Sequence, residues 1–379
     1  QDFRPSYLRI LDFIDSLPRR PIVSAFTATA TREVKDDIAQ TLRLRDPEIV
    51  ITGFDRPNLY YRVEATRRKD AFVADYVRSH PGESGIIYCA TRKNVDAVQE
   101  MLRGEDISAA RYHAGMTNEE RRQSQNDFIY DAAPVIVATN AFGMGIDKSN
   151  VRYVIHYNMP QSMENYYQEA GRAGRDGLPS QCILLFSPQD IVINRFLLDH
   201  KENDDLDDEA ADLLRARDNQ RLQAMANYCQ TTGCLRNYIL RYFGEEPAEP
   251  CGSCGNCDRE FEEVDMTAQA KWMINCVAET RGRYGKGVVL NTLRGANMAR
   301  LRELGAMDYR SYGQLKDCTR DELDCLLAQL LEEGYLVQTD DQYAVLHIGD
   351  IAPLKAGGQV LVKLPPRREP EQARAPKPK

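Results

Sequence analysis

The sequence predicts an α/β fold, in which helices cover a parallel β-sheet, followed by a helical metal-binding module and a winged-helix domain. Short apolar runs alternate with helical patterns over the first half of the chain, which is typical of parallel sheets. Four cysteines crowd together between residues 234 and 257. Further along, three helical patterns precede two short strand patterns, as in a winged helix.

Length and composition limit the functions that the chain can have. Its 379 residues are enough for about two or three domains with separate cores. The net charge of −8 excludes a uniformly basic surface, but a local basic groove could still bind nucleic acid. The chain has no run of 18 apolar residues, and residues 1–10 lack a signal-peptide pattern. We therefore expect no membrane span and a reducing compartment.

The predicted sheet rests on five apolar segments, each followed by polar residues and most of them by a helical pattern. They lie at residues 22–26, at the start of residues 84–98, at 135–138 and 153–157, and within residues 181–188. Ligands of parallel sheets bind beyond the carboxyl ends of the strands. We therefore expect the polar residues that follow the first three strands to line one rim; these are residues 27–29, 89–92 and 139–140.

The stretch QEAGRAGRDG, residues 168–177, predicts an anion-binding loop. Arg172 and Arg175 stand three residues apart among small residues, which cannot shield their guanidinium groups. Arginine keeps its charge and presents a planar fork of donors. A nucleotide phosphate is one fitting anion, and a surface loop with ordinary acid partners is the alternative.

Six motifs in order give these segments a specific meaning. Residues 168–177 resemble motif VI of superfamily 2 helicases, in the form used by the RecQ family. AFTATA resembles motif III, GFDRPNLYYRV the entry to the second RecA-like lobe, and GIIYCATRKNVD motif IV. YHAGM resembles the next short motif, and VIVATNAFGMGIDKSNVRYVIHYNMP resembles motif V. The resemblance continues to about residue 350 and implies a RecA-like sheet with the end of lobe 1 and a complete lobe 2.

The resemblance implies a nucleotide site in which Arg172 and Arg175 act as arginine fingers on ATP. Gln168 would help to place the nucleotide or the attacking water, and Gly145 and Asp147 would lie near the nucleotide.

The resemblance also implies contacts with DNA and between the lobes. Four residues would touch the DNA backbone at the rim of the sheet, namely Thr91, Arg92, Thr139 and Asn140. Thr27 and Thr29 would couple the two lobes. A helix cap or a strand-end hydrogen bond is the alternative role for each threonine. His113 could equally be a packed core residue.

Two parts that such a helicase needs are missing from the sequence. One is the phosphate loop Gly-x-x-x-x-Gly-Lys-Ser/Thr, and the other is a strand that ends in an acid pair for Mg²⁺. RYGKGVV has Gly287 where Ser or Thr is required, and DEAA at residues 208–211 follows an acidic run rather than a buried strand. We therefore expect a fragment that lacks most of lobe 1 and does not hydrolyse ATP alone, whereas the full-length protein would use ATP with Mg²⁺.

The cysteine cluster predicts a structural zinc site. Cys234, Cys251, Cys254 and Cys257 have the spacing C-x16-C-x2-C-x2-C, which can surround one tetrahedral ion. Four thiolates leave no position open for water, which indicates a structural role. An iron–sulfur cluster is the alternative. The RecQ family carries a zinc module of this spacing at this place, which agrees with zinc.

The winged-helix segment predicts a second contact with DNA. Arg281, Arg283 and Lys286 stand near Tyr284 in ETRGRYGKG, where they could bind phosphates. A solvated charged loop is the alternative. The helix pattern at residues 319–336 is largely acidic on its exposed side, which argues against simple insertion into a groove.

These features predict a domain order and a function. The expected domains are the lobe 1 remnant (1–52), lobe 2 (53–200), a zinc module (201–262), a winged helix (263–350) and a linker or disordered tail (351–379). The resemblance implies an ATP-dependent 3′–5′ DNA helicase in repair and recombination, acting on single-stranded and duplex or forked DNA. It also implies the bacterial cytoplasm, at the nucleoid, and single-strand-binding protein as a possible partner. A non-catalytic zinc-containing winged-helix DNA-binding protein is the alternative.

Overall fold

The computed structural model describes residues 5–27, 32–50, 53–142, 148–200, 208–339 and 344–364. The chain divides into two compact units. The first contains Gln1–Leu185 and Arg236–Cys251, and the second contains Phe186–Leu235 and Gly252–Lys379. Among the helices of these described residues, none is long and apolar enough to cross a membrane.

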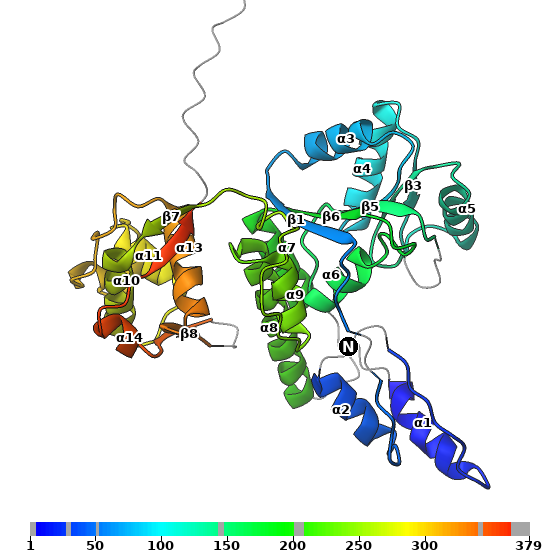
Figure 1. Cartoon of the computed structure of the whole chain (residues 1–379), viewed down its shortest axis with the longest axis horizontal. Helices are drawn as coiled ribbons and strands as arrows, with labels where there is room; N and C mark the ends of the chain where they lie inside the picture. Colours follow the sequence, from blue (N-terminus) through cyan, green and yellow to red (C-terminus); the bar gives the residue numbers. More distant parts are fainter. Residues whose placement is uncertain are drawn as a thin grey trace, which may run out of the picture. The chain divides into compact units, whose positions relative to one another are not determined.

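A six-stranded sheet with the order β1-β6-β5-β2-β4-β3 organises the first part of the chain (Figure 1). The pairings of β2 with β4 and β5, of β3 with β4, and of β5 with β6 are parallel. The predicted parallel α/β fold is therefore confirmed. The strands are β1 (Leu59–Ala65), β2 (Ser84–Tyr88), β3 (Ala109–Tyr112), β4 (Val135–Ala138), β5 (Val151–His156) and β6 (Ser180–Phe186).

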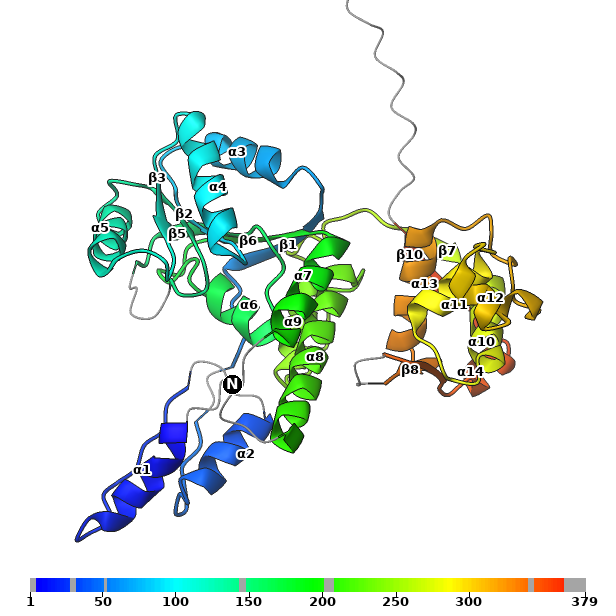
Figure 2. The ribbon, with the colours of Figure 1, turned by 180° about the vertical axis from the view of Figure 1, so that it is seen from behind.

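Helices cover both faces of this sheet. Figures 1 and 2 show α3 (Lys69–Ser79) and α4 (Arg92–Gly104) over one face and α6 (Met163–Ala170) at the opposite face. The apolar residues of α4 recur at helical spacing, so Val95, Val98 and Leu102 all point into the core. A further helix, α5 (Asn118–Ile129), follows β3 and begins with a capping box.

The N-terminal segment differs from the sequence prediction. It forms α1 (Pro5–Ser16) and α2 (Arg32–Thr41), but residues 22–26 are neither a strand nor buried. Ile22 is 97% exposed and Phe26 is 94% exposed. A parallel strand needs a neighbouring strand to satisfy its backbone. In the described part of the chain no strand pairs with this segment, so the prediction of a buried strand here is wrong.

Three helices follow the sheet, two before the first cysteine of the cluster and one directly after it. They are α7 (Pro188–Asp199), α8 (Asp208–Gln230) and α9 (Leu235–Tyr242). Helix α7 starts with Pro188 just after Ser187, whose hydroxyl and the Asp190 carboxylate form a capping box. The module around the cysteines is thus helical, as the sequence predicts.

The predicted winged helix is also present (Figure 2). Its helices are α10 (Thr267–Glu279), α11 (Lys286–Leu293), α12 (Ala299–Glu303), the short 3₁₀ helix η1 (Ala306–Asp308) and α13 (Arg320–Glu332). The hairpin consists of β8 (Leu336–Gln338) and β9 (Leu346–Ile348). The capping pattern at the start of α13 is realised, because Thr319 and Glu322 form a reciprocal capping box.

Residues 351–364 do not form the linker expected there. They contain α14 (Ala352–Lys355) and β10 (Leu361–Leu364), and β10 pairs antiparallel with β7 (Glu262–Asp265). Val360 and Val362 are buried in the core of the winged-helix domain. Their alternation with exposed residues is a strand signal that the glycines before it and the prolines after it obscured. The remainder of the expected tail, 365–379, lies outside the described residues.

Candidate functional site

The carboxyl ends of β2 and β4 bring four of the predicted DNA contacts to one edge of the sheet. Tyr88 is paired in register with Ala138, and the amide of Cys89 donates to the carbonyl of Ala138 at 2.8 Å. The chain leaves the two neighbouring strands at this edge. The residues that follow, Thr91 and Arg92 on one side and Thr139 and Asn140 on the other, therefore share the predicted rim.

The four rim residues differ in how accessible they are. Arg92 and Asn140 are exposed, whereas Thr139 is buried. The hydroxyl oxygen of Thr91 accepts a hydrogen bond from the amide of Asn94 at 3.2 Å and caps α4. The capping role considered for Thr91 is thus real, and it leaves the hydroxyl proton able to donate to another acceptor.

The YHAGM segment lies against the same rim. The amide of Thr139 donates to the carbonyl of Tyr112 at 3.1 Å. Arg92 packs on Gly115, where an added Cβ would lie 3.3 Å from an Arg92 nitrogen. His113 is buried; its Nδ1 accepts from the Gly115 amide at 3.1 Å, and its Nε2 lies 3.2 Å from the Asp96 carboxylate. His113 therefore orders this loop from inside.

Arg172 and Arg175 follow α6 but lie in different environments. Arg172 is only 8% exposed and hydrogen-bonds to the hydroxyl of Tyr88, at the carboxyl end of β2. Burial raises the pKa of Tyr88 well above its usual range, although Arg172 acts in the opposite direction, so the phenol stays protonated. Arg175 and Gln168 are exposed. The loop thus holds one guanidinium at the sheet edge and presents the other to solvent.

A buried histidine and a buried glutamate contact each other directly before this loop, between β5 and α6. The Nε2 of His156, the last residue of β5, lies 2.9 Å from a carboxylate oxygen of Glu169 in α6. The His156 ring stacks on Tyr88, with ring centroids 5.5 Å apart. The sequence shows only the residue types, so this pair was not predicted.

Gly174 and Gly177, in the loop that carries Arg172 and Arg175, allow a prediction about the stability of the fold. Gly174 has φ +55°, and an added Cβ would lie 2.5 Å from Nδ2 of Asn58 and 2.8 Å from the Leu178 carbonyl oxygen. We expect Gly174→Ala to lower the free energy of unfolding by about 2–4 kcal/mol, through left-handed strain plus overpacking. Chemical denaturation measures this change.

Gly177 is the matched control. It also has a positive φ, +80°, but an added Cβ would meet nothing within 4 Å. We expect Gly177→Ala to cost only about 1 kcal/mol, from the backbone strain alone. Equal costs for the two variants would show that the close contacts at Gly174 are not what requires a glycine there.

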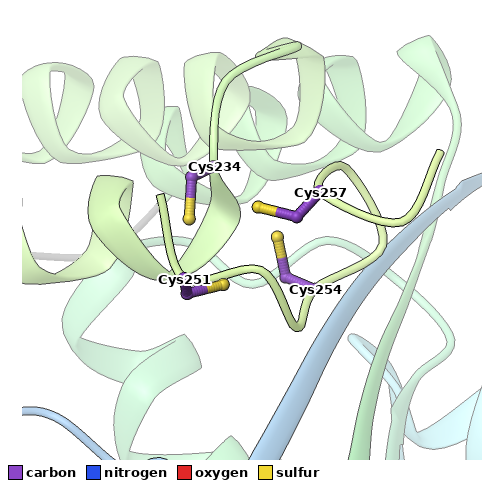
Figure 3. A group of neighbouring side chains, drawn as sticks. All are labelled: Cys234, Cys251, Cys254 and Cys257. Carbon is purple, nitrogen blue, oxygen red and sulfur yellow. The ribbon is translucent and has the colours of Figure 1, made fainter. Parts of the chain in front are cut away.

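Four cysteines converge at the predicted metal centre (Figure 3). The Sγ atoms of Cys234, Cys251, Cys254 and Cys257 all lie within 4.8 Å of one another. A tetrahedral zinc ion with Zn–S bonds of about 2.3 Å needs sulfur atoms about 3.8 Å apart. The arrangement therefore fits zinc after small side-chain adjustments.

The protonation of the cluster depends on whether a cation is bound. Burial and the neighbouring Cys254 and Cys234 thiols raise the pKa of Cys257, because a thiolate there would be poorly hydrated and close to other sulfur atoms. A divalent cation reverses this balance, since coordination deprotonates a thiol. The donor set is all sulfur, which suits zinc and leaves no ligand position for water.

The basic segment predicted to bind phosphates lies beside the wing. Gly285 forms an antiparallel bridge with Val345, and the amide of Leu346 in β9 donates to the carbonyl of Tyr284 at 3.1 Å. The segment thus extends the β8–β9 hairpin, a pairing that the sequence did not suggest.

The three basic side chains of this segment are not equivalent. Arg281 and Arg283 are exposed. Lys286 is half-buried, and its Nζ lies 3.8 Å from Asp324. Burial lowers the pKa of Lys286, whereas Asp324 acts in the opposite direction. The two arginines are therefore better placed for phosphate than the lysine.

The remaining predicted residues give less information. Gly145, Asp147 and Thr29 lie outside the described residues. Thr27 is exposed. The structure therefore leaves their predicted roles in nucleotide binding and lobe coupling as expectations.

The order of these parts along the chain is that of a helicase motor lobe extended by accessory modules. Comparison with known families makes this specific. The model described as "Helicase conserved C-terminal domain" matches residues 68–177. "RecQ zinc-binding" matches residues 188–258, and "RQC domain" matches residues 260–373. The chain belongs to the RecQ family, and its four cysteines form the zinc site of the zinc-binding module.

Curated relatives agree with this assignment. The "ATP-dependent DNA helicase RecQ" of Bacillus subtilis is 41% identical over 92% of this chain and 57% of its own length. The protein of the same name from Pasteurella multocida is 35% identical over 97% of this chain and 57% of its own length. That from Haemophilus influenzae is 36% identical, over 89% and 53%. The chain thus spans little more than half the length of these bacterial relatives.

Proposed function

We propose that this chain is the second motor lobe, zinc module and winged helix of an ATP-dependent 3′–5′ DNA helicase acting in repair and recombination. One observation carries the proposal: Arg172 and the predicted DNA rim meet at the same edge of one sheet. Arg172 forms a hydrogen bond with the side chain of Tyr88, the last residue of β2. Thr91 and Arg92 follow Tyr88 within four residues. A change at the nucleotide can therefore reach the DNA contacts over a short distance.

Arg172 and Arg175 would neutralise the charge that develops on the phosphate oxygens during ATP hydrolysis. Arg172, held by Tyr88, would contribute fixed positive charge at the edge of the sheet. Arg175, which is exposed, would reach the phosphates from the loop. Gln168 is also exposed, one turn before Arg172, where it would orient the nucleotide or the attacking water.

DNA would bind at two places. Single-stranded DNA would run along the rim, where Arg92 and Asn140 are exposed and Thr91 keeps a proton to donate. Duplex DNA would contact the wing, where Arg281 and Arg283 are exposed beside the hairpin. These contacts go to the backbone, so they would hold DNA without reading its sequence.

The zinc ion would stabilise the fold without entering the reaction, because four thiolates saturate it. ATP and Mg²⁺ would be held largely by a first lobe carrying a phosphate loop and an acid pair. We propose that the chain as given binds DNA and zinc but does not turn over ATP. The bacterial relatives support a site of action at chromosomal DNA in the bacterial cytoplasm.

The test is ATP hydrolysis by the zinc-loaded chain, with and without single-stranded DNA, alongside a DNA-binding titration at several salt concentrations. We expect no turnover, but salt-dependent binding that weakens in Arg92→Ala. Glu100→Ala, also in α4, is the control. DNA-stimulated turnover would contradict the proposed inactivity. A loss of DNA binding only in Arg281→Ala and Arg283→Ala, with none in Arg92→Ala, would favour a non-catalytic winged-helix DNA-binding protein.

A further inference from the structure

A short segment before β1 touches two distant parts of the chain at once. We call residues 54–58 the strap and residues 171–178 the arginine loop, which carries Arg172 and Arg175. The sequence marked the strap only as the entry to the lobe. One group of its contacts is to the arginine loop, and another is to α9, which begins directly after the zinc ligand Cys234.

The strap holds the arginine loop by its backbone. Nη2 of Arg56 donates to the carbonyl oxygens of Ala173 at 3.2 Å and Gly174 at 3.1 Å, and Nη1 lies 3.4 Å from that of Gly171. Asn58 donates through Nδ2 to the carbonyl of Gly174 at 2.9 Å. These carbonyls flank Arg172, so the strap fixes the backbone from which that side chain projects.

The same strap is held from the other side by Arg236 of α9. This side chain is buried, and its Nη1 donates to the Asp55 carboxylate at 2.8 Å and to the carbonyl of Arg56 at 2.6 Å. Its Nη2 donates to the carbonyl of Leu59 at 2.7 Å. One guanidinium thus binds the carboxylate of Asp55 and the backbone carbonyls of Arg56 and Leu59.

Arg236 also reaches the metal centre. It lies two residues after Cys234 and forms a side-chain hydrogen bond with Cys251. A charged donor at a metal-bound sulfur atom orients the ligand and is itself oriented by it. A continuous set of contacts therefore runs from two zinc ligands through Arg236 and the strap to the arginine loop.

The strap also contacts the residues that directly follow α9. The rings of Phe54 and Phe243 are stacked, with centroids 4.5 Å apart. The amide of Phe54 donates to the Glu245 carboxylate at 2.6 Å, and its carbonyl accepts from the hydroxyl of Tyr167 in α6 at 2.9 Å. Phe54 is thus fixed both to the end of α9 and to the helix that precedes the arginine loop.

We propose that Arg56 is a positioning residue for the arginine loop, and that Arg236 makes the position of that loop depend on the zinc centre. The inference deepens the proposed function and rests on it for the role of the loop at ATP. Each arginine acts by holding backbone, and a shift of about 1 Å in a catalytic group is enough to lower a rate about a hundredfold.

Hydrogen exchange of the zinc-loaded chain tests the positions without needing ATP. The amides of Gly174, Asp176 and Leu178 are hydrogen-bonded in the loop, so their exchange reports its order. We expect Arg56→Lys and Arg236→Lys each to speed exchange at residues 171–178 about tenfold, because lysine keeps the charge but loses the fork of donors. Arg259→Lys, exposed and two residues after Cys257, is the control and should change nothing there.

Zinc removal completes the test. In the wild-type chain we expect chelation to speed exchange at residues 171–178 as well as around the cysteines. We expect Arg236→Lys to retain zinc, because Arg236 is not one of the four ligands. In this variant chelation should add little further exchange in the loop, because the connection is already broken. Unchanged loop exchange in Arg236→Lys, or chelation effects confined to residues 234–257, would overturn the proposal.

Kinetics of the two-lobed protein separate positioning from general stability. Arg56→Lys should lower kcat for ATP hydrolysis while leaving KM for ATP and Tm near their wild-type values. Faster loop exchange with unchanged kcat would keep the mechanical connection but refute the role of the loop at ATP. Lower kcat only together with a lower Tm would reduce Arg56 to a structural residue and overturn the positioning role.

Discussion

Replacing Arg175 by alanine in the two-lobed protein is expected to lower kcat for ATP hydrolysis by about 10³–10⁵-fold. An arginine finger stabilises charge that appears only in the transition state, so KM for ATP should change little. Arg175 is exposed, so the variant removes little packing from the fold. Steady-state ATPase assays with saturating single-stranded DNA measure the effect.

Arg103→Ala is the matched control, because Arg103 is an exposed arginine in the last turn of α4. It should retain wild-type kcat. Arg175→Lys should fall between the wild type and Arg175→Ala, since lysine keeps the charge without the planar fork. A wild-type kcat in Arg175→Ala would remove this residue from the proposed nucleotide site and leave Arg172 as the arginine that acts there.

Replacing Cys254 by serine is expected to abolish zinc binding and to unfold the zinc module. Cys254 is fully buried, and its sulfur belongs to the four-cysteine cluster. Structural zinc contributes apparent binding free energies of about 10–16 kcal/mol, as much as the whole stability of a typical domain. Metal analysis should fall from one zinc per chain to none, and far-ultraviolet circular dichroism should show lost helix.

Cys229→Ala provides the control for this prediction. Cys229 is a buried cysteine five residues before Cys234, but it is not part of the cluster. This variant should keep one zinc per chain and lose only the modest stability of a small buried side chain. Full zinc content in Cys254→Ser would mean that three cysteines suffice and that the fourth ligand is not essential.

Much of the sheet and the whole metal centre follow from local sequence patterns. The strands β2, β4, β5 and β6 are short and mainly apolar, because most of their residues are buried on both faces of the sheet. The cysteines are predictable for a different reason. The geometry of zinc demands a fixed ligand type at close spacing, and few other arrangements use it.

Other features depend on contacts between residues far apart in the chain, and no local pattern reports them. The hydrogen bonds from Arg236 to the strap join residues about 180 positions apart in the sequence. The contact of His156 with Glu169 depends on how α6 packs against β5, which no local pattern reports. Residues 22–26 show the converse error. Their apolar pattern is that of a buried strand, but burial also needs a partner that the pattern itself does not supply.

The pairing of β7 with β10 determines how the winged-helix domain responds to mechanical load. Leu364 is opposite Glu262, and Leu361 is opposite Asp265. The chain enters the domain and leaves it at the same end of this two-stranded ribbon. Tension along the polypeptide therefore pulls its hydrogen bonds apart one after another, from the 262–364 pair inward, rather than shearing them all together. The two strands therefore separate before any force reaches the helices of the domain.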